Sequence, residues 1–354
     1  MTQPSRFTIA SRSLPAGLLL LACAGLAPAC VAPGDGDDHD ATGTRDSAVT
    51  VPTGLGLDAP DGEFLATPTG RIHRSCVHVV DNGAEIDASG RVTSAAGGSI
   101  QLAPCRYAVR DRILPGPAAA TAPPGAHANS VAENASWIET VSAQMPTNGF
   151  GFNWTNSVRG NWLVPPTPRQ AASQTVFLLI GAAPLNNSAL LETVLQYGAS
   201  AAGGGKFWST FLAYNSDNTG NVVLTSARRV NVGDLIQGLI DGLDCSGDGH
   251  CNWRLRVNIN VDPSSPTFSI SPPEIFHKAY EGVLAAVNLH NCNQLPVEGD
   301  TGASFTNVHI LMPGPTPSNY TDVKNSLGWV GTVNGSGCSY GMINNLDGVD
   351  LFWN

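Results

Sequence analysis

Residues 253–261 read WRLRVNINV, and this run decides the class of fold. Its odd positions are apolar and its even positions are polar, so one face of the segment is dry and the other is wet. Because side chains alternate between the two faces of a β-strand, a period of two predicts a half-buried strand. Strands of this kind are typical of antiparallel sheets that pack one face on a core.

Further short runs of strand type surround this segment, with turn residues between them. They lie at residues 162–166, 175–180, 194–197, 207–214, 221–225, 229–232 and 235–240. Short strands at this spacing predict an all-β fold, a two-sheet antiparallel sandwich that occupies residues 131–354. Residues 281–288 alone have a helix-like composition, which predicts a helix there.

The first 30 residues have the features of an export signal. Arg6 and Arg12 precede a short apolar run at residues 14–22, which is too short to cross a membrane. The sequence LLAC at residues 20–23 resembles a bacterial lipobox, so Cys23 is the expected site of lipidation. The alternatives are cleavage before Cys30 and ordinary secretion. In each case we expect an extracytoplasmic protein. Lipidation would make the anchor its contact with a membrane, whereas ordinary secretion would leave it without a lipid.

Three segments separate the signal from the sandwich. Residues 31–62 are rich in Asp, Gly and Thr and predict a disordered acidic tether. Residues 63–113 contain β-branched runs and the turn sequence Asp-Asn-Gly at residues 81–83, which predict a small β module. Residues 114–130 are a linker of Pro, Ala and Gly.

Six cysteines follow the signal, an even number that favours disulfides in an exported chain. Their grouping predicts three local pairs: Cys76–Cys105, Cys245–Cys251 and Cys292–Cys338. A zinc site is disfavoured because no Cys-x-x-Cys spacing and no matching His pair occur. The oxygen-rich segment at residues 244–251 lacks the terminal bidentate Glu of a calcium loop, so we expect a stapled hairpin tip and no metal or cofactor.

The composition narrows the classes of partner. The chain carries 18 Lys and Arg against 28 Asp and Glu, a formal net charge of −10. Nucleic-acid binding would require a basic stripe, so this charge argues against it. The 39 glycines and 25 prolines are typical of a turn-rich extracellular β protein. A polypeptide substrate or an unidentified surface ligand remains as the expected partner.

Gln196 is the strongest candidate for a catalytic residue. It ends the apolar run LETVLQYG at residues 191–198, and its carboxamide donates hydrogen bonds without titrating. Such a group suits the stabilisation of an oxyanion, although a Gln in a strand is more often structural. Trp208 and Tyr214 are candidates for a ligand-stacking platform, and the alternative is that they fill the core.

Four short motifs carry a resemblance to a known family. They are WLVP at residues 162–165, the strand at residues 175–180, LQYG at residues 195–198 and VGD at residues 232–234. Their order resembles that of the eqolisin-like glutamic peptidases, including an exported bacterial lipoprotein branch. The resemblance implies a concanavalin-like or jelly-roll sandwich whose concave face carries a catalytic Gln and Glu.

The resemblance assigns Gln196 to the oxyanion-stabilising role and implies a Glu as general base. Counting from Cys292, the expected position of the Glu falls near Ala285, so Glu281, four residues away, becomes the candidate base. With this base the protein would be an acid peptidase, a hydrolase that cleaves extended polypeptides. Without it, the sandwich would be a catalytically inactive binding module for carbohydrate or protein ligands. Both functions are carried forward to the structure.

Overall fold

The computed structural model describes residues 63–110, 136–262, 265–296, 302–314, 319–334 and 338–353. The predicted signal with Cys23 and Cys30, the tether of residues 31–62 and the linker of residues 114–130 lie outside the described residues. Where the structure is described, it consists of β-strands, short 3-10 helices and turns. None of its helices is long and apolar enough to cross a membrane.

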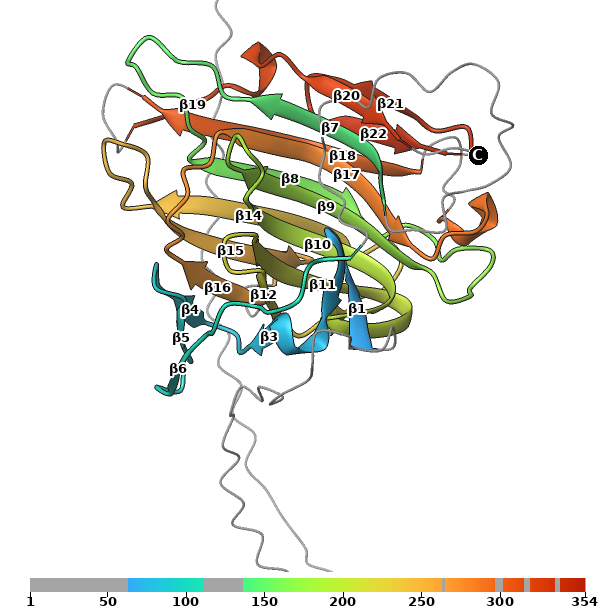
Figure 1. Ribbon diagram of the computed structural model, residues 1–354. Helices are drawn as coiled ribbons and strands as arrows, with labels where there is room; N and C mark the ends of the chain where they lie inside the picture. Colours follow the sequence, from blue (N-terminus) through green and yellow to red (C-terminus); the bar gives the residue numbers. More distant parts are fainter. Residues whose placement is uncertain are drawn as a thin grey trace, which may run out of the picture. The chain divides into compact units, whose positions relative to one another are not determined.

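Two large sheets form the predicted sandwich, as the ribbon diagram shows (Figure 1). The nine-stranded sheet has the order β20 (Val330–Val333), β7 (Ser136–Gln144), β17 (Lys278–Val287), β9 (Thr175–Ala183), β10 (Ala189–Ser200), β11 (Gly203–Ser216), β12 (Asn221–Thr225) and β3 (Val77–Val80), with β13 (Arg228–Arg229) paired to β11.

The eleven-stranded sheet has the order β21 (Gly341–Asn344), β22 (Val349–Phe352), β18 (Ala303–Pro313), β8 (Ser157–Leu163), β14 (Leu235–Leu243), β15 (Asn252–Ile259), β16 (Thr267–Ile270), β4 (Ala84–Ile86), β5 (Arg91–Thr93) and β6 (Ser99–Gln101), with β19 (Tyr320–Asp322) paired to β18. A separate hairpin consists of β1 (Phe64–Thr67) and β2 (Gly70–His73). The all-β sandwich predicted from the sequence is therefore confirmed.

The decisive run behaves as its pattern predicts up to Ile259, where β15 ends; Val261, the last apolar residue of the run, is 68% exposed. In β15, Trp253, Leu255 and Val257 are buried, while the polar residues between them are exposed or half-buried. The buried side chains belong to the main core, to which both sheets contribute. The period of two in this segment therefore follows from one apolar and one solvated face.

The helix expected at residues 281–288 does not form, because this segment lies in β17. This strand is hydrogen-bonded to β7 on one side and to β9 on the other, so it is central to the nine-stranded sheet. Its alanines and small apolar residues fit between two packed layers. Tertiary pairing has overridden the local helix propensity of those residues.

The predicted N-terminal module is joined to both sheets of the sandwich. Its strand β3 pairs in parallel with β12 of the nine-stranded sheet, and its strand β4 pairs in parallel with β16 of the eleven-stranded sheet. Residues 81–83 therefore cross from one sheet to the other. The sequence indicated the strands and the turn of this module but not these attachments.

Three disulfides are present, and they join the same pairs that the cysteine grouping predicts. They are Cys76–Cys105, Cys245–Cys251 and Cys292–Cys338. The second closes the hairpin between β14 and β15, and the third joins η3 (Cys292–Gln294) to residues near the C-terminus. Each bridge restricts the unfolded chain and so favours the folded state.

A second apolar cluster lies on the outer face of the nine-stranded sheet, which is the face away from the eleven-stranded sheet. Phe177, Phe211 and Tyr280 from this sheet pack there with Ile72 and Cys76 from the N-terminal region. The hairpin β1–β2 covers this face, and β1 contacts β10 (Figure 1). The central strands β9, β10 and β17 are consequently buried on both sides over most of their length.

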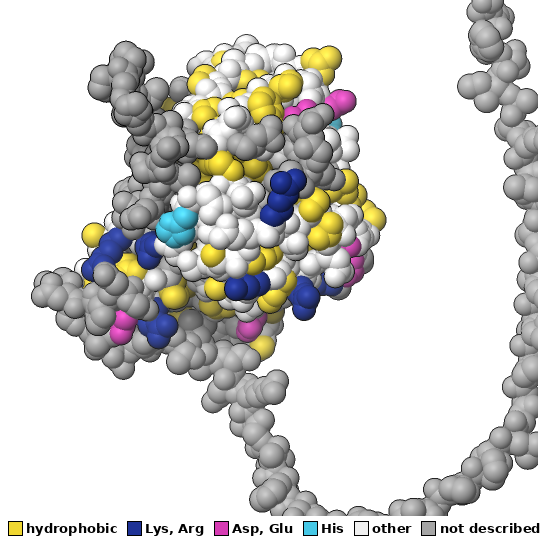
Figure 2. Space-filling model, turned by 90° about the vertical axis from the view of Figure 1, so that its right-hand side faces the viewer, with side chains coloured by type: hydrophobic (Ala, Val, Ile, Leu, Met, Phe, Trp, Pro, Cys, Tyr) yellow, Lys and Arg dark blue, Asp and Glu magenta, His cyan; other side chains and the backbone are white. Residues whose placement is uncertain are grey.

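On the face of the molecule that Figure 2 shows, charged side chains are few and lie among uncharged residues. Asp241 is a buried carboxylate on the outer face of the eleven-stranded sheet, between two arginines. There, Asp241 forms ion pairs with Arg159 at 2.8 Å and Arg256 at 3.6 Å.

Candidate functional site: the outer face around Gln196

Gln196 lies on β10, and the alternation of this strand decides where its side chain points. Leu195 and Tyr197 belong to the core between the sheets, whereas Val194 belongs to the cluster on the outer face. Gln196 therefore shares the outer face with Val194. Its side chain is fully buried.

The carboxamide of Gln196 is held by two hydrogen bonds. Its Nε2 donates to the carbonyl oxygen of Gly203 at 2.9 Å and to Oγ of Ser209 at 3.1 Å. A primary amide has two N–H donors, so both are used. Oε1 is buried and has no hydrogen-bond partner among the described residues. This side chain thus has no free N–H group for an oxyanion.

Ala285 lies on the same face as Gln196 and in the same row across the sheet. Gln196 of β10 is opposite Phe177 of β9, and Phe177 is opposite Ala285 of β17. Two strand spacings separate Gln196 from Ala285, which is about 10 Å between their Cα atoms. Ala285 occupies the position that the resemblance assigns to the catalytic glutamate, and Phe177 lies between it and Gln196. The side chain of Ala285 is only a methyl group.

Glu281 is not brought to Gln196. It sits at a register irregularity of β17, between Tyr280 and Gly282. Its Oε1 forms an ion pair with Nζ of Lys324 at 2.8 Å, and its Oε2 accepts a hydrogen bond from Nδ2 of Asn344 at 3.1 Å. Asn344 belongs to β21 of the eleven-stranded sheet, so Glu281 is directed toward that sheet.

The N-terminal hairpin closes the face that carries Gln196. The indole Nε1 of Trp137 donates to the carbonyl oxygen of Pro68 at 2.7 Å, and the backbone N–H of Ala201 donates to the carbonyl oxygen of Ala66 at 2.9 Å. Ala285 is 1 % exposed and Gln196 is 0 % exposed. An extended polypeptide therefore has no access to this row in the described structure.

The two aromatic candidates have different surroundings. Trp208 is buried in the main core, where its ring meets that of Tyr197 edge-on at 5.5 Å between centroids. The stacking platform expected from Trp208 is therefore absent. Tyr214 is also largely buried, but it lines a cavity of about 400 Å³ at one end of the sandwich. Its hydroxyl donates to Oε2 of Glu274 at 3.3 Å.

Three glutamates, Glu139, Glu192 and Glu281, are fully buried in the described structure. The sequence identified only Glu281 as a candidate. Burial raises the pKa of Glu139 to about 8. Burial also raises the pKa of Glu192 well above its ordinary value, against a hydrogen bond from Asn215. Burial raises the pKa of Glu281 despite Lys324. The sequence signal that could have identified Glu139 and Glu192 is a single acidic residue within a strand-type run, in β7 and β10 respectively.

Among the described residues, no group of three or more His, Cys, Asp or Glu side chains is arranged so that it could hold a metal ion. The segment at residues 244–251 is a disulfide-closed hairpin tip. Its polar groups bond to each other, since Oγ of Ser246 lies within hydrogen-bond distance of both Oδ1 of Asp248 and the carbonyl oxygen of His250.

Comparison with known proteins gives matches in structure alone. No family model and no curated protein matches the sequence. Two solved structures of scytalido-glutamic peptidase, one with a peptide-based transition state analog and one with a transition state analog inhibitor, each have a TM-score of 0.40. Their identities are 11% and 10%, and the matches cover 62% and 64% of this chain and 98% and 100% of those chains.

A third structure is SCP-B, a member of the eqolisin family of peptidases, in a complex with the tripeptide Ala-Ile-His. It has a TM-score of 0.38 and 11% identity, and the match covers 62% of this chain and 98% of that chain. Similarity at this level does not assign a function. The function is therefore argued from the geometry of this chain.

The contact between Gln196 and the turn after β10 can be tested at two adjacent glycines. Gly203 and Gly204 both have positive φ angles, 96° and 97°. A Cβ on Gly204 would collide with Nε2 of Gln196 and would lie 2.6 Å from the carbonyl oxygen of Gly198, whereas a Cβ on Gly203 would meet nothing within 4 Å. We expect Gly203→Ala to cost about 1 kcal/mol from backbone strain alone, and Gly204→Ala to cost several kcal/mol more.

Chemical denaturation of both variants would measure this difference in the free energy of unfolding. Equal losses for the two variants would contradict the close packing of Gly204 against Gln196 and Gly198.

The raised pKa of Glu139 predicts how stability depends on pH. Below its ordinary value of 4.5 the carboxyl is protonated in both states, and above about 8 it is ionised in both. Between these values the folded protein keeps a proton that the unfolded chain has lost, so stability falls as pH rises. We expect Glu139→Gln to reduce this slope, by up to about 1.4 kcal/mol per pH unit.

Denaturation at a series of pH values would measure the slope. Glu192 and Glu281 contribute in the same direction, so part of the slope remains in the variant. The control is Glu85→Gln, which removes an exposed carboxyl and should leave the slope unchanged. A slope unaffected by Glu139→Gln would contradict the prediction.

Proposed function

We propose that this protein is a non-hydrolytic β-sandwich binding module. The observation that carries the proposal is the state of the row that contains Gln196. Both amide N–H groups of this residue are already bonded within the protein, and Ala285 stands two strands away without a carboxylate. The N-terminal hairpin covers the outer face of the nine-stranded sheet at this row, so the row is not open to a substrate.

Hydrolysis of a peptide bond by a glutamine–glutamate pair requires two functions. A carboxylate accepts a proton from the attacking water, and a neutral donor stabilises the oxyanion. Glu192 shares a strand and a face with Gln196, but it lies four residues away, roughly 13 Å along the strand. Its Oε2 accepts a hydrogen bond from Asn215 at 2.7 Å, and burial favours its protonated form, which is not a base.

A binding role is supported by the cavity at the end of the sandwich. Its volume of about 400 Å³ is typical of small-ligand sites, and Tyr214 contributes to its lining. Carbohydrate and protein ligands are both compatible with an extracytoplasmic β-sandwich. The cavity is separate from the closed face, so binding there does not depend on the residues of the former catalytic hypothesis.

The absence of hydrolysis is tested with the purified protein and denatured casein across the acid pH range. We expect no cleavage above that of a buffer control, and the same result for Gln196→Ala. This variant should instead lose roughly 1–3 kcal/mol of stability, because it removes two buried hydrogen bonds. Cleavage by the wild-type protein that Gln196→Ala abolishes would overturn the proposal in favour of a peptidase.

We also propose that the mature protein is anchored by a lipid on Cys23. Support comes from the lipobox-like LLAC at residues 20–23 and the acidic segment that follows it. In a bacterial host, Cys23→Ser should block lipid incorporation and move the protein from the membrane fraction to a soluble or uncleaved form. Unchanged membrane fractionation, with Cys30→Ser losing it instead, would move the site to Cys30.

A further inference from the structure

We propose that the cavity at the end of the sandwich binds a compact amphipathic amine, whose apolar body enters the cavity while its ammonium group meets carboxylates at the rim. This inference rests on the proposed binding function and specifies its site and its class of ligand. Nothing in the resemblance to peptidases places a ligand here, because the cavity lies away from the row of Gln196.

The cavity lies where the N-terminal module joins the two sheets. Tyr214 and Val223 come from the nine-stranded sheet, Ile86 and Ile270 come from strands of the eleven-stranded sheet, and residues 101–104 form a further wall. Its position follows from the chain path, because β3 and β4 pair with different sheets and hold their edges together. The site therefore exists only in a chain that carries this module.

The lining is mainly apolar and suits a hydrocarbon body. Ile86, Leu102, Val223, Ile270 and Pro272 all contribute to it. A volume of about 400 Å³ accommodates an alkyl chain or a ring system of moderate size. Burial of such a group provides a driving force of roughly 25 cal/mol for each Å² of apolar surface removed from water.

The charges around the cavity select against anions. Among its described lining residues there is no Lys or Arg, and the one charged side chain is Asp87. Glu274 lies beside the lining, where its carboxylate accepts hydrogen bonds from Tyr214 at 3.3 Å and Asn218 at 2.6 Å. Two carboxylates at an apolar cavity in a protein of net charge −10 favour a cationic ligand group and disfavour a carboxylate.

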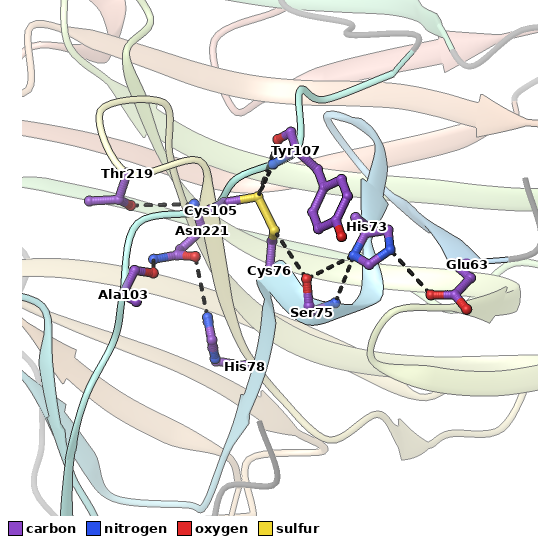
Figure 3. The surroundings of a disulfide bond; sticks show 10 residues. All are labelled: Glu63, His73, Ser75, Cys76, His78, Ala103, Cys105, Tyr107, Thr219 and Asn221. Atoms are coloured by element: carbon purple, nitrogen blue, oxygen red, sulfur yellow. Dashed lines mark hydrogen bonds and ion pairs between the residues drawn. A yellow bond between two sulfur atoms is a disulfide. The ribbon is translucent and has the colours of Figure 1, made fainter. Parts of the chain in front are cut away.

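The wall at residues 101–105 is fixed in advance of binding. Figure 3 shows the Cys76–Cys105 disulfide with the hydrogen bonds around it. The backbone N–H of Cys105 donates to the carbonyl oxygen of Thr219 at 2.6 Å, and Nδ2 of Asn221 donates to the carbonyl oxygen of Ala103 at 2.9 Å. A preformed wall reduces the ordering cost of binding.

Behind this wall, the ring of His78 supports Asn221. Nε2 of His78 lies 3.3 Å from Oδ1 of Asn221, and both residues are buried (Figure 3). Asn221 is therefore held from two sides, by His78 and by the backbone of Ala103. The strand β12, the N-terminal strand β3 and the cavity wall thus form one connected unit.

Three probes with the same eight-carbon body test the ligand class: n-octylamine, n-octanol and octanoate. Isothermal titration calorimetry on the purified protein, below micelle-forming concentrations, gives their dissociation constants. We expect octylamine to bind about ten-fold more tightly than octanol, with octanoate weakest. Equal affinities for the three probes would overturn the assignment of an amine.

Two matched tryptophan variants locate the site. Ala88 lines the cavity and is exposed, so Ala88→Trp should fill the entrance and abolish octylamine binding without disturbing the core. Ala96 is exposed and is not a lining residue, so Ala96→Trp should retain binding. Retention of octylamine binding in Ala88→Trp would place the ligand elsewhere and refute the proposal.

A charge variant separates the amine preference from simple apolar binding. Asp87→Asn should reduce the ratio of octylamine to octanol affinity several-fold while octanol affinity stays constant. An unchanged ratio in Asp87→Asn combined with Glu274→Gln would refute the role of the rim carboxylates. These outcomes are independent of the casein assay, so failure of this inference is distinguishable from failure of the non-hydrolytic function.

Discussion

Burial of the central strands of the nine-stranded sheet on both faces is the constraint on which the rest of this structure depends. Its strand β9 is buried at every position. One face needs the eleven-stranded sheet as a cover, and the other needs the N-terminal hairpin. Polar side chains on the outer face then depend on partners inside the protein. Gln196 uses Gly203 and Ser209, and Glu192 uses Asn215.

The sequence was informative where a feature depends on residues that are close together in the chain. The alternation in β15 predicted its buried face, and the cysteine grouping predicted the three disulfides. The continuous apolar run of β9 also implied burial on both faces, but it does not say what provides the second cover. That cover comes from residues more than 100 positions earlier in the chain, so no local pattern in β9 contains it.

The candidate site was partly predictable for the same reason. The resemblance put Gln196 and the position near Ala285 on one face, although residues 281–288 were expected to be helical. The strand register of the structure sets the two residues in one row. Glu281 was assigned by its distance along the chain, which a bulge in β17 makes misleading, because one extra residue redirects the side chains near it. Hydrogen bonds of the Gln196 amide depend on the turn at Gly203, and the sequence gives no indication of their geometry.

The buried and exposed carboxyls of this protein divide the effects of pH between the fold and the cavity. Burial raises the pKa of Glu139, so this residue lowers the stability of the fold least in mildly acidic solution, where its carboxyl is neutral. Asp87 at the cavity behaves oppositely: hydrogen bonds from the Ser89 side chain and the Arg91 backbone lower its pKa below 3.8. It therefore stays ionised while the interior glutamate is protonated. Between these two values a protonated Glu139 coexists with an ionised Asp87 at the rim, and an amine ligand keeps its charge throughout that range.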